Sequence, residues 1–174
     1  TLSSSSAASD VYKRQHPYFY FTWGAAISEA LLDINTGESR ILRADIVQDC
    51  GNSLNENIDI GQIEGGFIQG LGWLTCEELC FSKEGKLLTT GPSTYKLPGS
   101  RDIPQIFNVK LLEKADNEEK TIFRSKAVGE PPLLLAISHF LALKEAIRAS
   151  STNSRPELLN SPATPSEILK VLKV

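Results

Sequence analysis

Apolar and polar residues alternate over the first part of this chain in a pattern typical of β-strands. Tyr18–Asp33 is rich in aromatic and small residues, and Arg40–Asp49 carries β-branched residues at spaced positions. Between them, Asn35-Thr36-Gly37 is a hairpin signal. We therefore expect these two segments to form an antiparallel pair of strands.

The apolar spacing then changes to that of a helix. From about Asn57 to Leu79 apolar residues recur three or four positions apart, and Asn52–Asn55 supplies helix-capping side chains just before them. Five glycines interrupt this predicted helix: Gly61, Gly65, Gly66, Gly70 and Gly72. Each costs about 1 kcal/mol in a helix interior. We interpret them as positions where another backbone or a flat ligand comes close.

The rest of the chain mixes turns, short strands and helices without a regular β-α-β alternation, which indicates an α+β fold. The predicted segments are a turn at Lys83–Lys86, a loop at Gly91–Gly99, a strand at Phe107–Leu112, a charged turn at Ala115–Lys120, a strand at Thr121–Arg124, a second long helix at Leu133–Ala149, a polar segment at Ser150–Arg155, and a capped helix start at Pro162–Glu167 leading into Ile168–Val174.

The chain has 174 residues and no methionine, and it opens in a Ser/Ala-rich stretch. We expect residues 1–15 to be a non-native or disordered leader, because such a stretch buries too little apolar area to offset its ordering entropy. Residues 16–174 have the size of one domain. The missing initiator methionine leads us to expect a fragment, or a mature or misassembled product.

Charge and cysteine content narrow the functional classes. The net charge is −3, the pI is about 5.5, and no basic run occurs, so the sequence disfavours a nucleic-acid partner. No apolar stretch is long enough for a membrane span or a signal peptide. Three cysteines without a secretory signal predict a reducing, cytoplasmic location. Cys76 and Cys80 could share a metal, but we favour two core thiols on the predicted helix.

The strongest chemical candidate is Glu130, within Lys126-Ala127-Val128-Gly129-Glu130-Pro131-Pro132. A proline fixes its own φ and biases the residue before it towards an extended conformation, so Glu130 is expected to be extended and held in place. Gly129 lacks a Cβ and admits close approach to the main chain. This arrangement suits a general base. The alternative is an ordinary turn in which the acid lies near the positive end of a helix dipole.

Three motifs occur together in the order and spacing of a known family. They are Gly61-Gln62-Ile63-Glu64-Gly65-Gly66-Phe67-Ile68-Gln69-Gly70-Leu71-Gly72, Gly91-Pro92-Ser93-Thr94-Tyr95-Lys96, and Lys126–Pro132, with Asn160–Pro165 following near the end. The chain from His16 to Val174 resembles the C-terminal part of the molybdenum domain of the xanthine dehydrogenase and aldehyde oxidase family. Gly72–Leu79 and Ser93–Lys96 look most like the molybdenum-binding subunit of bacterial-type xanthine dehydrogenases.

The resemblance implies roles for individual residues. Glu130 would be the base that takes the proton of a hydroxyl on molybdenum, whose oxygen then attacks an electron-poor carbon of hypoxanthine or xanthine. Gln62 would hydrogen-bond the molybdopterin cofactor, and Gly129 would let its motif lie against the metal centre. The implied fold is the C-terminal portion of a molybdenum-cofactor-binding domain, with mixed antiparallel strands and two long helices.

The resemblance also implies partners beyond this chain. FAD and 2Fe-2S clusters would lie on other segments or subunits, together with the rest of the molybdenum domain, and the complete enzyme would be a homo-oligomer. Two alternatives stay open. One is an aldehyde oxidase that acts on aldehydes and N-heterocycles; the other is a non-catalytic interaction domain in which Glu130 is a helix-start acid and Gly91–Gly99 is a docking loop.

Overall fold

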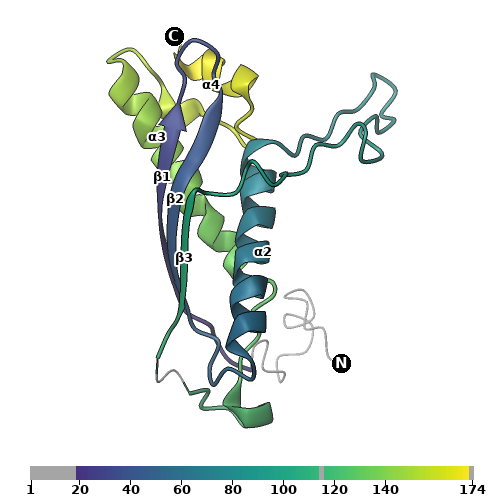
Figure 1. Cartoon of the computed structure of the whole chain (residues 1–174). Coiled ribbons are helices and arrows are strands. Elements are labelled where there is room, and N and C mark those ends of the chain that lie inside the picture. The colour runs from purple at the N-terminus through teal and green to yellow at the C-terminus, as the bar shows by residue number, and fades with distance from the viewer. Residues whose placement is uncertain (1–18, 114–115, 173–174) are drawn as a thin grey trace, which may run out of the picture.

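The structure is a computed structural model that describes residues 19–113 and 116–172 (Figure 1). Its elements are β1 (Gly24–Leu32), β2 (Ser39–Gln48), α2 (Glu56–Thr75), β3 (Ile106–Leu111), α3 (Ile137–Ser150) and α4 (Pro165–Leu172), with 3₁₀ helices η1 (Ile122–Arg124), η2 (Pro131–Ala136) and η3 (Pro156–Leu158). The expected leader at residues 1–15 lies outside the described residues, as does part of the expected charged turn at 115–120.

A three-stranded mixed sheet in the order β1-β2-β3 forms one layer of the molecule. The predicted hairpin is confirmed: β1 and β2 are antiparallel from Gly24 opposite Gln48 to Leu32 opposite Ser39, although β1 begins later than predicted. Gly37 in the turn has φ +74°, which favours glycine. β3 lies parallel to β2, and α2 makes the crossover that a parallel pair requires. The fold is therefore α+β with one parallel crossover.

Helix α2 starts where the sequence predicts it. Asn55 is the N-cap, and its side chain accepts a hydrogen bond from Ile58 N at 3.3 Å. The helix ends at Thr75, however, and not at Leu79. A Cβ on Gly72 would lie 2.4 Å from Pro98 Cγ, because the returning chain crosses the helix end there. Cys76 and Cys80 thus lie beyond the helix, and the prediction of two helical core thiols is wrong.

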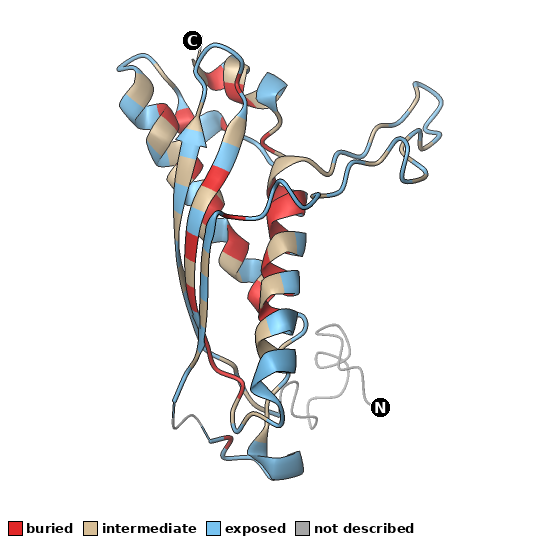
Figure 2. Cartoon of the chain, in the orientation of Figure 1, coloured by how far each residue is buried: buried red, intermediate tan, exposed pale blue. Residues whose placement is uncertain are grey.

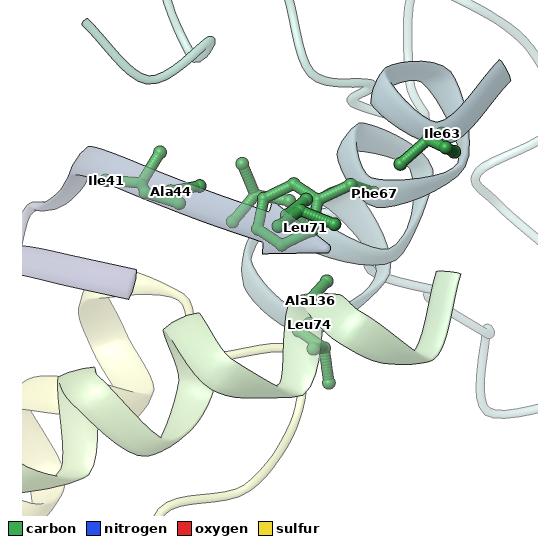
Figure 3. Packing of buried hydrophobic residues seen from close by; sticks show 8 residues of the cluster. Ile41, Ala44, Ile63, Phe67, Leu71, Leu74 and Ala136 are labelled. Carbon is green, nitrogen blue, oxygen red and sulfur yellow. The ribbon is translucent and has the colours of Figure 1, made fainter. Parts of the chain in front are cut away.

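The main core lies between the sheet and α2, with a contribution from η2. Figure 3 shows the close packing, and Figure 2 shows that α2 is buried on its inner side and exposed on its outer side. Phe67 is fully buried, and its ring centroid is 5.5 Å from that of Phe107 in β3. The buried members are Ile41, Ala44, Ile46, Ile63, Phe67, Leu71, Leu74 and Ala136. A second cluster joins α3 to the C-terminal segment through Leu143, Ile147, Leu159, Ala163, Ile168 and Val171.

Two predictions in the second half of the chain are wrong in type or extent. Thr121–Arg124 is not a strand: it contains η1, and Phe123 has φ +51°. Local hydrogen bonds of Thr121 and Ser125 satisfy this loop without a partner strand. The first four residues of the helix predicted at Leu133–Ala149 belong to the 3₁₀ helix η2, and α3 begins only at Ile137. Two prolines at the start of η2 lack the N–H groups that regular helical bonding uses.

Further along, the capped helix start is confirmed, because Thr164 Oγ1 accepts from Glu167 N at 3.4 Å at the start of α4. Across residues 19–113 and 116–172, no helix is both long and apolar enough to cross a membrane.

Candidate functional site

The three residues predicted for the site come together at one end of α2. Gln62 is on the second turn of α2, and Gly129 and Glu130 immediately precede η2. Gln62 Oε1 lies 3.4 Å from the position that a Cβ on Gly129 would take. All three residues are exposed. The Gln62 amide therefore adjoins the backbone of Gly129, and the exposed residue Glu130 follows Gly129 directly in the chain.

Close packing of η2 on α2 produces this arrangement. A Cβ on Gly66 would lie 2.9 Å from Gly129 O, and a Cβ on Gly70 would lie 2.2 Å from Leu133 O and 2.9 Å from Ala136 Cβ. Neither position has room for a side chain. These two glycines are explained by another backbone of the same chain, not by a ligand.

The remaining glycines of α2 have different surroundings. Gly72 contacts the returning chain, as described above. Gly61 and Gly65 are exposed, and an added Cβ at either would meet nothing within 4 Å. They flank Gln62 and lie one turn apart, so they leave a low-relief strip on the outer side of α2. A flat molecule could approach the helix backbone along this strip.

Glu130 does not have the extended conformation that was predicted. Its backbone is helical, with φ −98° and ψ −39°, because it is the N-cap of η2 and its carbonyl accepts from Leu133 N at 3.1 Å. The bias that a following proline exerts is overcome by this 3₁₀ turn. The Glu130 side chain makes no capping bond, and within the described residues no ion pair involves its carboxylate. Glu130 is an exposed residue.

A buried ion pair beside the site was missed from the sequence. Lys126 Nζ donates to Asp49 Oδ2 at 2.6 Å, and the two side chains are only 10% and 1% exposed. The other oxygen of Asp49 accepts from Gly51 N at 2.8 Å. The available signal was Asp49 itself, an acid at the end of the predicted strand Arg40–Asp49. Its partner is far away in sequence, so local pattern could not identify the pair.

A hollow of about 560 Å³ lies at the opposite end of α2 and does not include Gln62, Gly129 or Glu130. Its charged lining residues are Arg40, Lys96, Arg101, Glu38, Glu78 and Asp102, so the lining favours neither sign of charge. Cys76 and Cys80 also line it, and burial is the main cause that raises the pKa of Cys76. Among the residues that the structure describes, no group of three metal-ligating side chains is found.

Comparison with known proteins shows the family of this chain. Residues 3–104 match the molybdopterin cofactor-binding domain family. The chain is 53% identical over 159 residues to the xanthine dehydrogenase/oxidase of Felis catus, covering 88% of this chain and 12% of that protein. It is 49% identical over 151 residues to the xanthine dehydrogenase of Dictyostelium discoideum, covering 85% of this chain and 11% of that protein.

Solved structures give the same fold. Quinoline 2-oxidoreductase from Pseudomonas putida 86 superposes with a TM-score of 0.70 at 27% identity, over 82% of this chain and 17% of that one. Aldehyde oxidoreductase from Desulfovibrio gigas superposes with a TM-score of 0.70 at 25% identity, over 88% of this chain and 16% of that one.

These matches define the class of protein. The chain belongs to the molybdopterin cofactor-binding domain family. It spans about an eighth of the length of the xanthine dehydrogenases that it resembles.

Proposed function

We propose that this chain is the part of a xanthine dehydrogenase-type molybdenum hydroxylase that carries the catalytic base, Glu130. The observation that carries the proposal is the proximity of Gln62 to Gly129, with the exposed residue Glu130 directly after Gly129. The proposed reaction is the oxidative hydroxylation of hypoxanthine or xanthine at an electron-poor carbon.

The residues present fit the molybdopterin cofactor. Gly61 and Gly65 leave open space beside Gln62, whose amide offers both donors and an acceptor to a polar heterocycle. Gly129 adds exposed backbone next to that amide. In this proposal Gln62, Gly129 and the glycine strip hold the cofactor. When bound, the cofactor supplies the redox chemistry, because its metal accepts the electrons that the substrate loses.

Glu130 has the properties that a proton acceptor needs. Its carboxylate is exposed, carries no capping bond, and belongs to a segment whose backbone packs on α2. A carboxylate with no competing partner can take a proton from a reacting group placed within hydrogen-bond reach. Because Gly66 and Gly70 let the backbone at Gly129 and Leu133 pack directly on α2, the backbone that carries Glu130 is held on both sides.

The substrate and partners are inferred from the relatives. The xanthine dehydrogenases that match this chain are about 50% identical to it over the matched residues, which favours a purine as the substrate. The substrate is a proposal because the chain spans only a small share of their length. The aldehyde oxidoreductase from Desulfovibrio gigas keeps aldehydes as the second candidate substrate class. We propose that FAD, 2Fe-2S clusters and the rest of the molybdenum domain lie on other segments or subunits of a homo-oligomeric enzyme. The likeness to a bacterial-type subunit stays a prediction.

The proposal is tested by Glu130→Gln in the complete, cofactor-loaded protein. Glutamine keeps the size of the side chain but cannot accept the proton, so the rate of enzyme reduction by xanthine per molybdenum should fall by about 10²–10⁴-fold. Molybdenum content and melting temperature should stay at the parent values, because only the transition state uses the proton acceptor.

Glu157→Gln is the matched control, because Glu157 is also an exposed acid at the start of a proline-led 3₁₀ helix, η3. It should leave the rate unchanged. If fully loaded Glu130→Gln protein is reduced at the parent rate, Glu130 is a helix-start acid and the proposal fails.

A further inference from the structure

The segment that leads to Glu130 is attached to the sheet through a buried ion pair. Lys126 is four residues before Glu130. Its Nζ donates to Asp49 Oδ2 at 2.6 Å, with side chains 10% and 1% exposed. Because both groups are withdrawn from water, this interaction is far less screened than an ion pair on the surface.

Asp49 is itself held in place from several directions. Its Oδ1 accepts from Gly51 N at 2.8 Å, and its backbone N donates to Trp23 O at 2.7 Å, across from the start of β1. Gln48 Nε2 donates to Asp49 O at 3.2 Å. The carboxylate that receives Lys126 is therefore a fixed point at the end of β2.

The backbone of the same segment is paired to the same point. Lys126 N donates to Cys50 O at 2.7 Å, and Gly51 forms an antiparallel bridge with Ser125. Gly51 has φ +64°, and a Cβ there would lie 2.4 Å from Arg124 O, so the junction is too tight for a side chain. The segment is thus fixed at Lys126 by the sheet and at Gly129 by α2, with Glu130 directly after the second contact.

We propose that Asp49 and Lys126 are positioning residues that set the location of the Glu130 carboxylate for proton transfer. This inference rests on the proposed function. The two side chains are buried and paired with each other, so they would act through the backbone between Lys126 and Glu130. A displacement of about 1 Å in a reacting group can cost about 10²-fold in rate, so a lost attachment four residues away is enough to matter.

The experiment compares Asp49→Asn, Lys126→Met and Lys126→Arg in the complete, cofactor-loaded protein. Asp49→Asn and Lys126→Met should lower kcat about 10–100-fold and leave KM for xanthine and molybdenum content near the parent values. Amide hydrogen exchange at Ala127, Val128 and Gly129 should become faster in both. Lys126→Arg keeps a donor to Asp49 and should restore most of the rate. Asp45→Asn is the control, since Asp45 pairs with Arg43 on the exposed face of the same strand.

The double variant D49L/K126M separates positioning from stability. Replacing a buried ion pair by apolar side chains often preserves stability, whereas removing one partner leaves a buried, unpaired charge. If positioning is the role, the double variant should melt near the parent temperature and still show low kcat and fast amide exchange. If instead its kcat recovers together with its stability, the pair is merely structural and the proposal is overturned. The double variant also keeps the test decisive should a single variant fail to fold.

Glu130→Gln, measured alongside, separates the two proposals. A normal rate in Glu130→Gln contradicts the proposed function and, with it, this inference. A low rate in Glu130→Gln together with normal kcat in Asp49→Asn and Lys126→Met leaves the proposed function standing and overturns the positioning role alone.

Discussion

His139 is a fully buried ionisable residue of α3, with 1% of its surface exposed. Its Nδ1 is buried and has no hydrogen-bond partner among the described residues. Burial lowers its pKa from 6.5 to about 4. The imidazole is therefore neutral in the folded protein at neutral pH, and it behaves as part of the packing between α3 and its neighbours.

This burial predicts a pH-dependent loss of stability. The unfolded chain takes up a proton at His139 below pH 6.5, whereas the folded chain does so only near pH 4. Stability is therefore complete above pH 6.5 and falls as the pH drops towards 4, by about 3 kcal/mol in total. His139→Leu should flatten this part of the melting-temperature profile in the complete protein. A variant whose acid slope equals that of the parent would contradict the assignment.

At the scale of elements, the contact between α2 and η2 locates the site. Gly66 and Gly70 allow the backbone of residues 129–133 to lie directly on the helix, and Ala136 adds a buried methyl group to the core. This contact brings the Glu130 segment beside Gln62. The same helix leaves Gly61 and Gly65 open, so its glycines have different surroundings on two faces.

Alanine substitutions distinguish these two faces. Gly70→Ala and Gly66→Ala should lower the free energy of unfolding by about 1–3 kcal/mol, since the new Cβ would clash with backbone that cannot easily move. Gly65→Ala is the matched control and should be neutral or stabilising by up to about 1 kcal/mol, because its Cβ meets nothing. Melting curves of the complete protein measure this difference. If Gly66→Ala and Gly70→Ala raise the melting temperature as Gly65→Ala does, the result contradicts the close packing of η2 on α2.

At the scale of the whole molecule, the site and the 560 Å³ hollow lie at opposite ends of α2. This separation matters because Cys76, Cys80 and His139 all line the hollow and not the proposed cofactor surface. The segment between α2 and β3, which includes the Gly91–Gly99 loop, extends away from the body of the molecule (Figure 1). Substitutions at the proposed cofactor surface and substitutions in the hollow can therefore be compared as independent tests of cofactor retention.

Gln62→Ala should reduce the molybdenum content per subunit of the complete protein, because it removes an exposed amide next to Gly129 that can bond the cofactor. A loss of one neutral hydrogen bond corresponds to about a 10-fold weaker affinity. Gln105→Ala, an exposed amide lining the hollow, is the control and should retain full metal content. Metal content and activity that both stay at the parent values in Gln62→Ala would remove Gln62 from the site.

The sequence by itself determined the elements whose signals are local. The β1–β2 hairpin, a cap within Asn52–Asn55 and a capped helix start within Pro162–Glu167 were predicted, because turn and capping residues act within a few positions of themselves. The candidate residues Gln62, Gly129 and Glu130 were also identified from sequence, through motifs and a family resemblance. Their roles remain proposals.

Only the tertiary structure decided features that depend on distant partners. The parallel placement of β3, the end of α2 at Thr75, and the pairing of Lys126 with Asp49 all arise between segments far apart in the chain. The surroundings of the glycines also depend on distant partners. The sequence gives the same signal for a helical glycine that a backbone covers, such as Gly70, and for one that nothing covers, such as Gly65. Propensity and periodicity describe a residue's neighbours along the chain, whereas packing is settled by neighbours in space.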